Sequence, residues 1–186
     1  TGEVIGCYRL LTAEGAAAVG AWYSASEFDL SPLADILPQT VELGRACIHP
    51  DYRNGGTVML LWAGLVKFMR DAGLRFMTGC GSISTRDGGH EAAGLYQELQ
   101  QKHLCPPEWR VRPLNPLNWP ALTPKENPEC PTLIKGYLKA GAWICGEPCV
   151  DEGGRRTVEK ILMDISRLND RYLQRFIQST PRTPAP

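Results

Sequence analysis

The chain has 186 residues, of which 43% are hydrophobic, which suffices for one well-buried core but not for two large domains. We therefore expect a single domain over residues 1–178 and a disordered Pro/Thr tail over residues 179–186. Lys plus Arg and Asp plus Glu both number 20, so no overall basic field would attract nucleic acid. Any charged ligand must be held by local groups.

The cysteines and the apolar runs indicate the compartment. Seven cysteines, an odd number, are scattered along the chain without a CxxC pair, which favours a reducing cytoplasm. No histidine has a second one three or four residues away, so we expect no metal site. No apolar run approaches the roughly 20 residues that span a bilayer, which predicts a cytoplasmic protein or one held peripherally at the inner membrane.

The first half of the chain predicts two strands that are separated by a loop. Residues 3–11 are rich in β-branched and aromatic side chains, a Gly/Ala-rich stretch follows, and residues 26–33 are expected to be irregular. Because the chain enters this first strand directly from Thr1, we expect it to be the C-terminal portion of a longer domain. Residues 40–48 form the second strand, which ends where proline restricts His49 to extended geometry.

An amphipathic helix and a third strand come next. Apolar residues recur at steps of three and four from Val58 to Met69, and Gly73 is a natural end for the helix. Residues 74–80 are typical of a buried strand. Strand, helix and strand together predict a βαβ unit with a right-handed crossover, and hence an α/β fold.

The second half is predicted to be mixed. A helix over residues 91–102 is followed by a short strand at residues 109–113. Eight of the chain's fifteen prolines lie between Pro106 and Pro131, which indicates a long ordered loop there. The remaining predicted elements are a helix at residues 132–142, an apolar strand at 158–165 and a short helix at 170–177.

The segment between the second strand and the amphipathic helix carries the strongest chemical signal. Consecutive backbone N–H groups at a glycine-rich helix start can hold a phosphate, and Gly55 with Gly56 allows close approach. An isolated glycine pair is more often only a tight turn. The stretch resembles the acyl-donor loop of GNAT acyltransferases, R/Q-x-x-G-x-G/A, through Arg53 and Gly56. Val58 departs from the pattern, which favours a donor with a single phosphate, such as phosphopantetheine on acyl carrier protein, over coenzyme A.

A closer resemblance covers nearly the whole chain. The stretches that carry it are GEVIGCYRLL, YSASEFDLSPL, VELGRACIHPDYR and LIKGYLKAGAWICGEP. They are similar to the hemolysin-like branch of the GNAT superfamily, typified by ornithine N-acyltransferases of lyso-ornithine lipid synthesis and related to acyl-homoserine-lactone synthases.

This resemblance implies a GNAT-like mixed β-sheet flanked by helices, N-terminally incomplete. It also implies transfer of a (3-hydroxy) fatty acyl group from an acyl carrier protein thioester, or from acyl-CoA, to an amino acid amine, with ornithine favoured. No tightly bound cofactor is expected. The alternatives are a long-chain N-acyl amino acid or acyl-homoserine-lactone synthase, and a non-catalytic module that binds acyl carrier protein or membranes.

The resemblance also implies a donor site along the second strand and the following loop. Gly44 within that strand indicates a β-bulge, which would bring Glu42 and Arg45 to one face. GNAT proteins carry a bulge at the equivalent strand, where a freed N–H polarises the thioester carbonyl. The predicted donor-binding residues are Arg45, Cys47, Arg53, Asn54, Gly55, Gly56 and Thr57. For the thiol of Cys47 we favour burial over a dyad with His49.

Two residues are predicted to be catalytic. Attack by an amine requires a base, for which Glu42 is the candidate, directly or through water; the alternative is an exposed strand-edge carboxylate or an ion pair with Arg45. Tyr96 stands in a stretch similar to the GNAT A-x-x-L-Y, whose tyrosine can protonate the departing thiolate. The alternative for Tyr96 is an aromatic ring on the core face of its helix.

Two acids are predicted to read the acceptor. Glu27 and Asp29 could hold the ammonium of an ornithine-like substrate, because a basic amino acid needs opposing carboxylates. The alternative is a pair of solvated loop acids, since the same stretch has the local chemistry of a turn that contains aspartate and proline.

Overall fold

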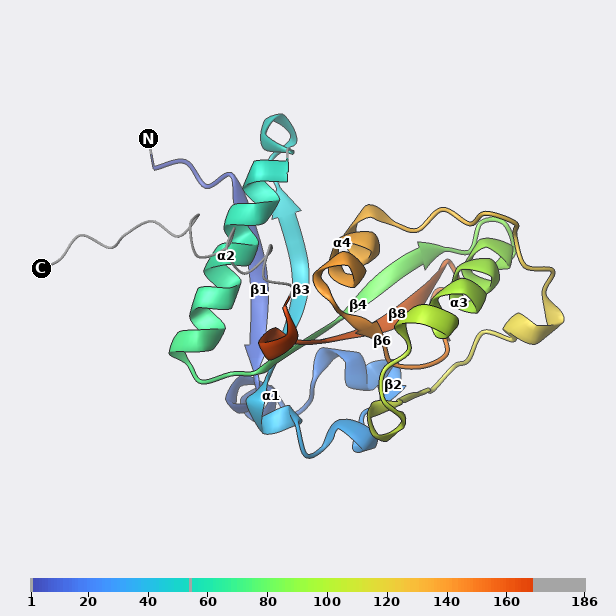
Figure 1. The fold of residues 1–186 in the computed structure, drawn as a ribbon, viewed down its shortest axis with the longest axis horizontal. Coiled ribbons are helices and arrows are strands. Elements are labelled where there is room, and N and C mark those ends of the chain that lie inside the picture. Colours follow the sequence, from blue (N-terminus) through green and yellow to red (C-terminus); the bar gives the residue numbers. More distant parts are fainter. Residues whose placement is uncertain (1, 54, 169–186) are drawn as a thin grey trace, which may run out of the picture.

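The computed structural model describes residues 2–53 and 55–168, and these residues form a mixed α/β fold around one main sheet (Figure 1). The strand order is β1-β3-β4-β8-β6, and β7 also pairs with β8. The bounds are β1 Gly6–Thr12, β3 Thr40–Ile48, β4 Phe76–Ser84, β6 Trp143–Ile144, β7 Cys149–Val150 and β8 Arg156–Asp164. A second sheet consists of β2 (Phe28–Asp29) and β5 (Arg112–Pro113). The predicted α/β class is confirmed.

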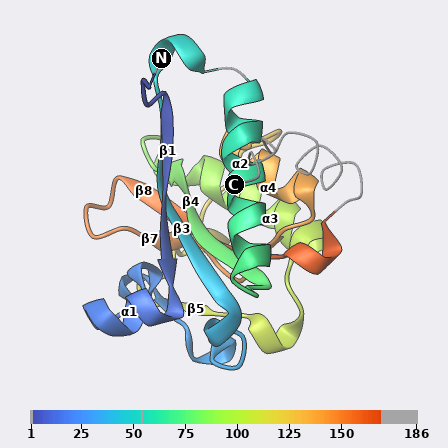
Figure 2. The ribbon, with the colours of Figure 1, turned by 90° about the vertical axis from the view of Figure 1, so that its left-hand side faces the viewer.

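The two faces of the main sheet are covered differently. On one face, which we call the helix side, lie α2 (Gly55–Asp71), α3 (His90–His103) and α4 (Thr132–Ala140) (Figure 2). On the other, the pocket side, lie the 3-10 turn η1 (Tyr23–Ser26), β2 and the segments around them. Successive side chains of β8 point to opposite faces of the sheet. Ile161 and Met163 belong to the core on the helix side, and Leu162 belongs to the core on the pocket side.

The predicted βαβ unit is present, and its two strands pair with each other over only part of their length. The second predicted strand coincides with β3, and α2 connects it to the parallel strand β4. The pairing covers Thr40–Leu43 against Phe76–Gly79; beyond it β3 continues beside β1, and β4 continues beside β8 (Figure 1). A gap in the hydrogen-bond ladder therefore begins after Leu43.

A β-bulge lies where the two strands part. Arg9 pairs with Gly44 and Cys7 pairs with Cys47, so two residues of β3 oppose the single residue Tyr8 of β1. One of the two, Arg45, has a φ of +54°, which is unusual for a residue with a side chain. The bulge predicted from Gly44 thus lies one residue further along the strand. Such a bulge bends its strand and increases the twist, which turns β3 away from β4.

Some elements differ from the predictions. The Gly/Ala-rich stretch forms the helix α1 (Ala13–Val19), which Thr12 caps by accepting a hydrogen bond from Gly15 N at 3.2 Å. The strand predicted at residues 109–113 is mostly a turn, with pairing only over β5. The helix predicted at residues 170–177 and the tail at 179–186 lie outside the described residues, so the domain bounds stay a prediction.

The proline-rich segment is an ordered loop, as predicted, and it is fastened to the start of α3. Lys125 N donates to His90 O at 3.0 Å, and Glu91 Oε1 accepts from Lys125 Nζ at 3.0 Å and from Glu129 N at 2.9 Å. Gly94 makes this contact close, because a Cβ built there would lie 2.4 Å from Lys125 O.

We predict that Gly94→Ala lowers the free energy of unfolding by about 1–3 kcal/mol, because the new methyl group meets backbone that cannot move without breaking the loop contacts. Gly136→Ala on α4 is the matched control. A Cβ there has no neighbour within 4 Å, so the change should raise stability by about 0.5–1 kcal/mol through helix propensity. Urea unfolding of both variants measures the difference; equal effects would contradict the close packing.

Candidate active site

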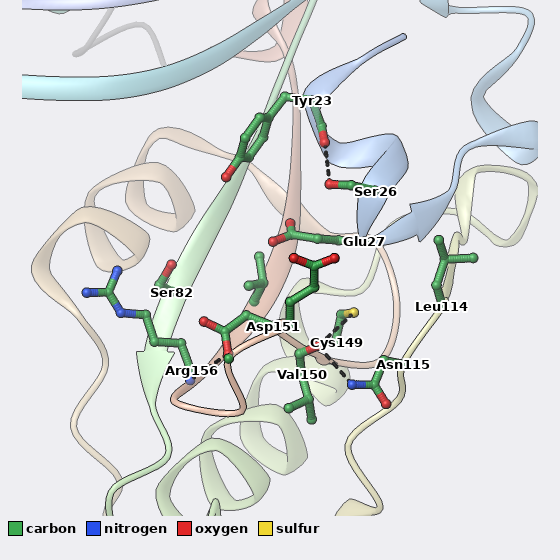
Figure 3. A pocket seen from close by; sticks show the side chains of 13 residues that line it. Tyr23, Ser26, Glu27, Ser82, Leu114, Asn115, Cys149, Val150, Asp151 and Arg156 are labelled. Carbon is green, nitrogen blue, oxygen red and sulfur yellow. Dashed lines mark hydrogen bonds between the residues drawn. The ribbon is translucent and has the colours of Figure 1, made fainter.

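A pocket of about 480 Å³ opens on the pocket side of the sheet (Figure 3). Its walls come from η1, from β4, and from the hairpin of β7 and β8. The lining residues are Tyr23, Ser26, Glu27, Ser82, Leu114, Asn115, Cys149, Val150, Asp151, Glu152, Gly153, Arg156 and Val158. The charged ones are three carboxylates and one guanidinium, so the pocket is complementary to a ligand with excess positive charge.

Glu27, one of the two predicted acceptor residues, lines this pocket. Figure 3 shows its side chain extending from the end of η1 toward Asp151 of the hairpin, while the guanidinium of Arg156 extends away from both on the side of Ser82. Its Oε2 is shielded from solvent and accepts no hydrogen bond from the described residues. Burial raises the pKa of Glu27, and this outweighs the opposing effects of a hydrogen bond with Cys80 and of the charge of Lys160.

Asp29, the other predicted acceptor residue, lies outside the pocket. Its carboxylate is exposed, and Oδ1 accepts a hydrogen bond from Ser31 N at 3.0 Å. That bond is the main cause of the lowered pKa of Asp29. The geometry is the aspartate turn of the alternative interpretation, and the structure does not bring the two acids together. Binding of the acceptor by Asp29 stays a prediction.

Glu42 is buried on the pocket side, with only 3% of the residue exposed. Its Oε2 accepts from Tyr23 N at 2.7 Å, and its Oε1 accepts from Ser24 N at 3.0 Å. Lys160 Nζ lies 3.5 Å from the same Oε1. The alternative of an exposed carboxylate or a pair with Arg45 is therefore wrong. The predicted role of Glu42 as base stays a prediction.

Lys160 is a site residue that the sequence analysis missed. It is 1% exposed and donates to Ser24 Oγ at 2.5 Å while it pairs with Glu42. The signal was available, because Glu159 and Lys160 are charged residues inside the apolar run at residues 158–165. A charge in a buried strand almost always has a partner.

The predicted donor residues follow the end of β3 and the start of α2. Arg45 is exposed at the bulge, and Arg53 is exposed with Nε donating to Ile48 O at 3.2 Å. Gly55, Gly56 and Thr57 form the first turn of α2, and Asn54 lies outside the described residues.

Cys47 shares this end of the sheet. It faces Cys7 across β1 and β3 beside a small surface hollow of about 250 Å³. Its thiol is exposed, so the predicted burial of this cysteine is wrong. Beyond Leu43, β3 pairs only with β1 and no longer with β4, so this end of the strand projects from the sheet and leaves Cys47 accessible.

Tyr96, the predicted acid, lies on the helix side and is 5% exposed. Its ring contacts that of Trp119 edge to face, with centroids 5.2 Å apart. Burial, with smaller effects of Glu147 and Glu159, raises the pKa of Tyr96 to about 12. The alternative of a core aromatic describes its packing; the phenol keeps its proton at neutral pH, and its role as an acid stays a prediction.

Glu159 is a second buried glutamate of the sheet and, unlike Glu42, it has no hydrogen-bond partner among the described residues. It is completely buried on β8, one residue before Lys160 and so on the opposite face, and neither oxygen accepts a hydrogen bond from the described residues. Burial raises its pKa to about 8, so the group is mainly neutral at pH 7.

Within the described residues no group of three or more His, Cys, Asp or Glu is arranged to hold a metal ion. None of the helices described here is both long and apolar enough to cross a membrane.

Comparison with known proteins gives relatives over nearly the whole chain. Residues 1–63 match the family described as "Acetyltransferase (GNAT) domain". The chain is 33% identical to an L-ornithine N(alpha)-acyltransferase of Rhizobium meliloti, covering 99% of this chain and 65% of that protein. It is 34% identical to that of Brucella abortus, covering 94% and 65%, and 31% identical to that of Rhodobacter capsulatus, covering 91% and 68%. The chain thus spans about two thirds of the length of these relatives.

A solved structure also aligns with the chain. It is a CoA-dependent acyl-homoserine lactone synthase with SAM and isopentyl-CoA, at 16% identity and a TM-score of 0.46, covering 98% of this chain and 61% of that one.

The buried carboxyl group of Glu159 predicts an unusual pH dependence of stability. Because its folded pKa is raised, its stabilising contribution is complete below the ordinary glutamate pKa and is lost as pH rises toward 8. Glu159→Gln cannot ionise, so the variant should gain on the order of 3 kcal/mol relative to the wild type between pH 5 and pH 7. Melting curves from pH 5 to 8 test this, with exposed Glu98→Gln as control; parallel wild-type and Glu159→Gln curves would contradict it.

Proposed function

Because the chain belongs to the L-ornithine N(alpha)-acyltransferase family, we propose that it transfers a fatty acyl group from a thioester to the α-amine of ornithine. The single observation that carries the proposal is the pocket that contains Glu27. It provides a surplus of carboxylates, and its wall includes Ser82 on β4, beyond the last residue of β4 that pairs with β3. The activity of the relatives is assigned to this chain only as a proposal, since the chain spans about two thirds of their length.

The pocket suits a cationic amino acid in size and in charge. Its volume of about 480 Å³ falls in the range of small-molecule sites. Ornithine carries two ammonium groups and one carboxylate, and the pocket offers Glu27, Asp151 and Glu152 against the guanidinium of Arg156. A guanidinium binds a carboxylate through two parallel hydrogen bonds, so Arg156 is the proposed partner of the ornithine carboxylate.

The donor is proposed to bind at the end of β3 and the start of α2, whereas the acceptor is proposed to bind in the pocket. The first turn of α2 directs its backbone N–H groups and the positive end of its helix dipole toward the proposed phosphate. Arg45 and Arg53 are exposed next to this turn. We favour phosphopantetheine on acyl carrier protein, as in lyso-ornithine lipid synthesis, over acyl-CoA because of Val58 in the donor loop.

The reacting thioester is proposed to lie between the donor site at the start of α2 and the pocket that contains Glu27. The bulge at Arg45 interrupts the ladder between β1 and β3, and a freed N–H there can polarise the thioester carbonyl, as the GNAT resemblance implies. Tyr96 is the proposed donor of a proton to the departing thiolate.

The proposal predicts a specific product. The purified protein, incubated with a 3-hydroxyacyl group on acyl carrier protein or on CoA, should acylate ornithine at its α-amine, as detected by mass spectrometry. Norvaline has the same carbon skeleton without the terminal ammonium and should be a much poorer acceptor, because the pocket carboxylates would be left unpaired. Equal use of the two amino acids, or no N-acyl product with either donor, would contradict the proposal.

The donor loop gives a second prediction. Gly56→Pro removes one N–H from the first turn of α2, where proline is compatible with a helix, so the donor KM should rise while the melting temperature changes little. Leu133→Pro makes the same change in the first turn of α4 and is the matched control, which should keep the donor KM. Unchanged donor affinity of Gly56→Pro in a direct titration would contradict the phosphate site.

A further inference from the structure

Two glutamates lie on the pocket side of the sheet, and they differ in what surrounds their oxygens. Both are connected to the turn η1, because Glu42 accepts hydrogen bonds from its backbone N–H groups and Glu27 directly follows it in the chain. Acyl transfer to the proposed acceptor requires that its ammonium first lose a proton. The surroundings of the two carboxylates decide which one can take it.

Glu42 is fully engaged. Each of its oxygens accepts a backbone N–H of η1, and the Lys160 ammonium lies 3.5 Å from Oε1. The residue does not line the pocket, and it is 3% exposed. Both oxygens of Glu42 are therefore occupied by groups that fix the turn.

Glu27 has a free acceptor at the pocket. Its Oε2 is shielded from solvent and has no hydrogen-bond partner among the described residues, and the side chain lines the pocket wall. Four groups on other elements act on it: Cys80 on β4, Lys160 on β8, Asp151 after β7 and Glu42 on β3. The two carboxylates and burial favour its protonated form, whereas Lys160 and the Cys80 hydrogen bond favour its charged form.

We propose that Glu27 is the general base of the reaction and that Glu42 and Lys160 are positioning residues that hold η1 in place. This assignment rests on the proposed N-acyltransferase function. It replaces the sequence-based prediction of Glu42 as base and gives the predicted acceptor contact of Glu27 a chemical role. The ammonium that forms a hydrogen bond with Oε2 is the group that gives up the proton.

The step balances as follows. The acceptor ammonium gives one proton to the Glu27 carboxylate, and the neutral amine nitrogen forms a C–N bond to the thioester carbonyl carbon. The C–S bond then breaks, the nitrogen loses a second proton, and the departing sulfur gains one. The products are an amide and a thiol, and Glu27 returns the first proton to solvent.

Lys160 and Glu42 contribute by geometry and charge. Lys160 donates to Ser24 Oγ and pairs with Glu42, so both residues fix the turn from which Glu27 extends. The hydrogen bond from Glu27 N to Ser24 O at 3.1 Å continues this connection. The charge of Lys160 also opposes the effect of burial on the Glu27 pKa.

The test is the pH dependence of kcat/KM for the acceptor. Glu27→Gln should lower the rate roughly 10²- to 10⁴-fold at pH 7. Because the amine deprotonates by itself at higher pH, the deficit should shrink about tenfold per pH unit up to the pKa of the acceptor ammonium. Glu27→Asp keeps a carboxylate and should retain the wild-type shape of the profile at a lower rate. Exposed Glu126→Gln is the matched control and should keep the wild-type profile.

Several outcomes would overturn the assignment. A Glu27→Gln deficit that is constant across pH, or one confined to acceptor KM with kcat preserved, would make Glu27 only a cation-binding residue. Recovery at high pH in Glu42→Gln, but not in Glu27→Gln, would return the base to Glu42. Under the proposal Glu42→Gln instead loses thermal stability and acceptor affinity without that recovery. A wild-type protein that forms no N-acyl product would refute the proposed function itself.

Discussion

The buried pair of Lys160 and Glu42 is the interaction on which the arrangement of the pocket depends. It joins β8 to β3 across the intervening strand β4, and through Ser24 it fixes the turn η1. Removal of one partner from a buried ion pair typically costs about 3–5 kcal/mol, because the other charge is left without compensation. The pair therefore ties the position of η1, which forms one wall of the pocket, to the sheet.

The second constraint is the departure of β3 from β4. A parallel pair that stayed together along its whole length would leave no room for a ligand between its ends. Here a positive φ at Arg45 interrupts the ladder of β3, and the two strands continue beside different neighbours. Residues held in sparsely populated backbone regions concentrate at functional sites, where the surrounding structure maintains them. One local distortion thus separates the glycine-rich start of α2 from the carboxylate-lined pocket.

The parts of this fold that sequence patterns predict are those with regular periodicity. The proline after His49 marked the end of β3, and the three- and four-residue spacing from Val58 to Met69 predicted α2. The helix α1 escaped prediction because it is seven residues long and buries only Ala16, so it has no apolar stripe. The strands β6 and β7 are two residues each, too short to show a period.

The site was predictable in its residue types but not in its contacts. The motif pointed to Glu27 and Glu42, but a one-dimensional pattern cannot say which carboxylate meets Lys160, since their separation in sequence exceeds 100 residues. The exposure of Cys47 depends on the bulge and on the edge strand, which are tertiary features. The hairpin wall of the pocket had no chemical motif at all.

That hairpin wall has its own internal fastening. Asp151 Oδ1 accepts hydrogen bonds from Arg155 N at 2.9 Å and from Arg156 N at 3.2 Å, so one carboxylate closes the turn. The residues between them, Glu152 to Gly154, are exposed and contribute little to the core. The side chain of Glu152 can therefore change without cost to the sheet, whereas Gly154 has a φ of +64° and is needed for the shape of the turn. The lining of the pocket can therefore vary at Glu152, independently of the buried pair of Lys160 and Glu42 that holds η1.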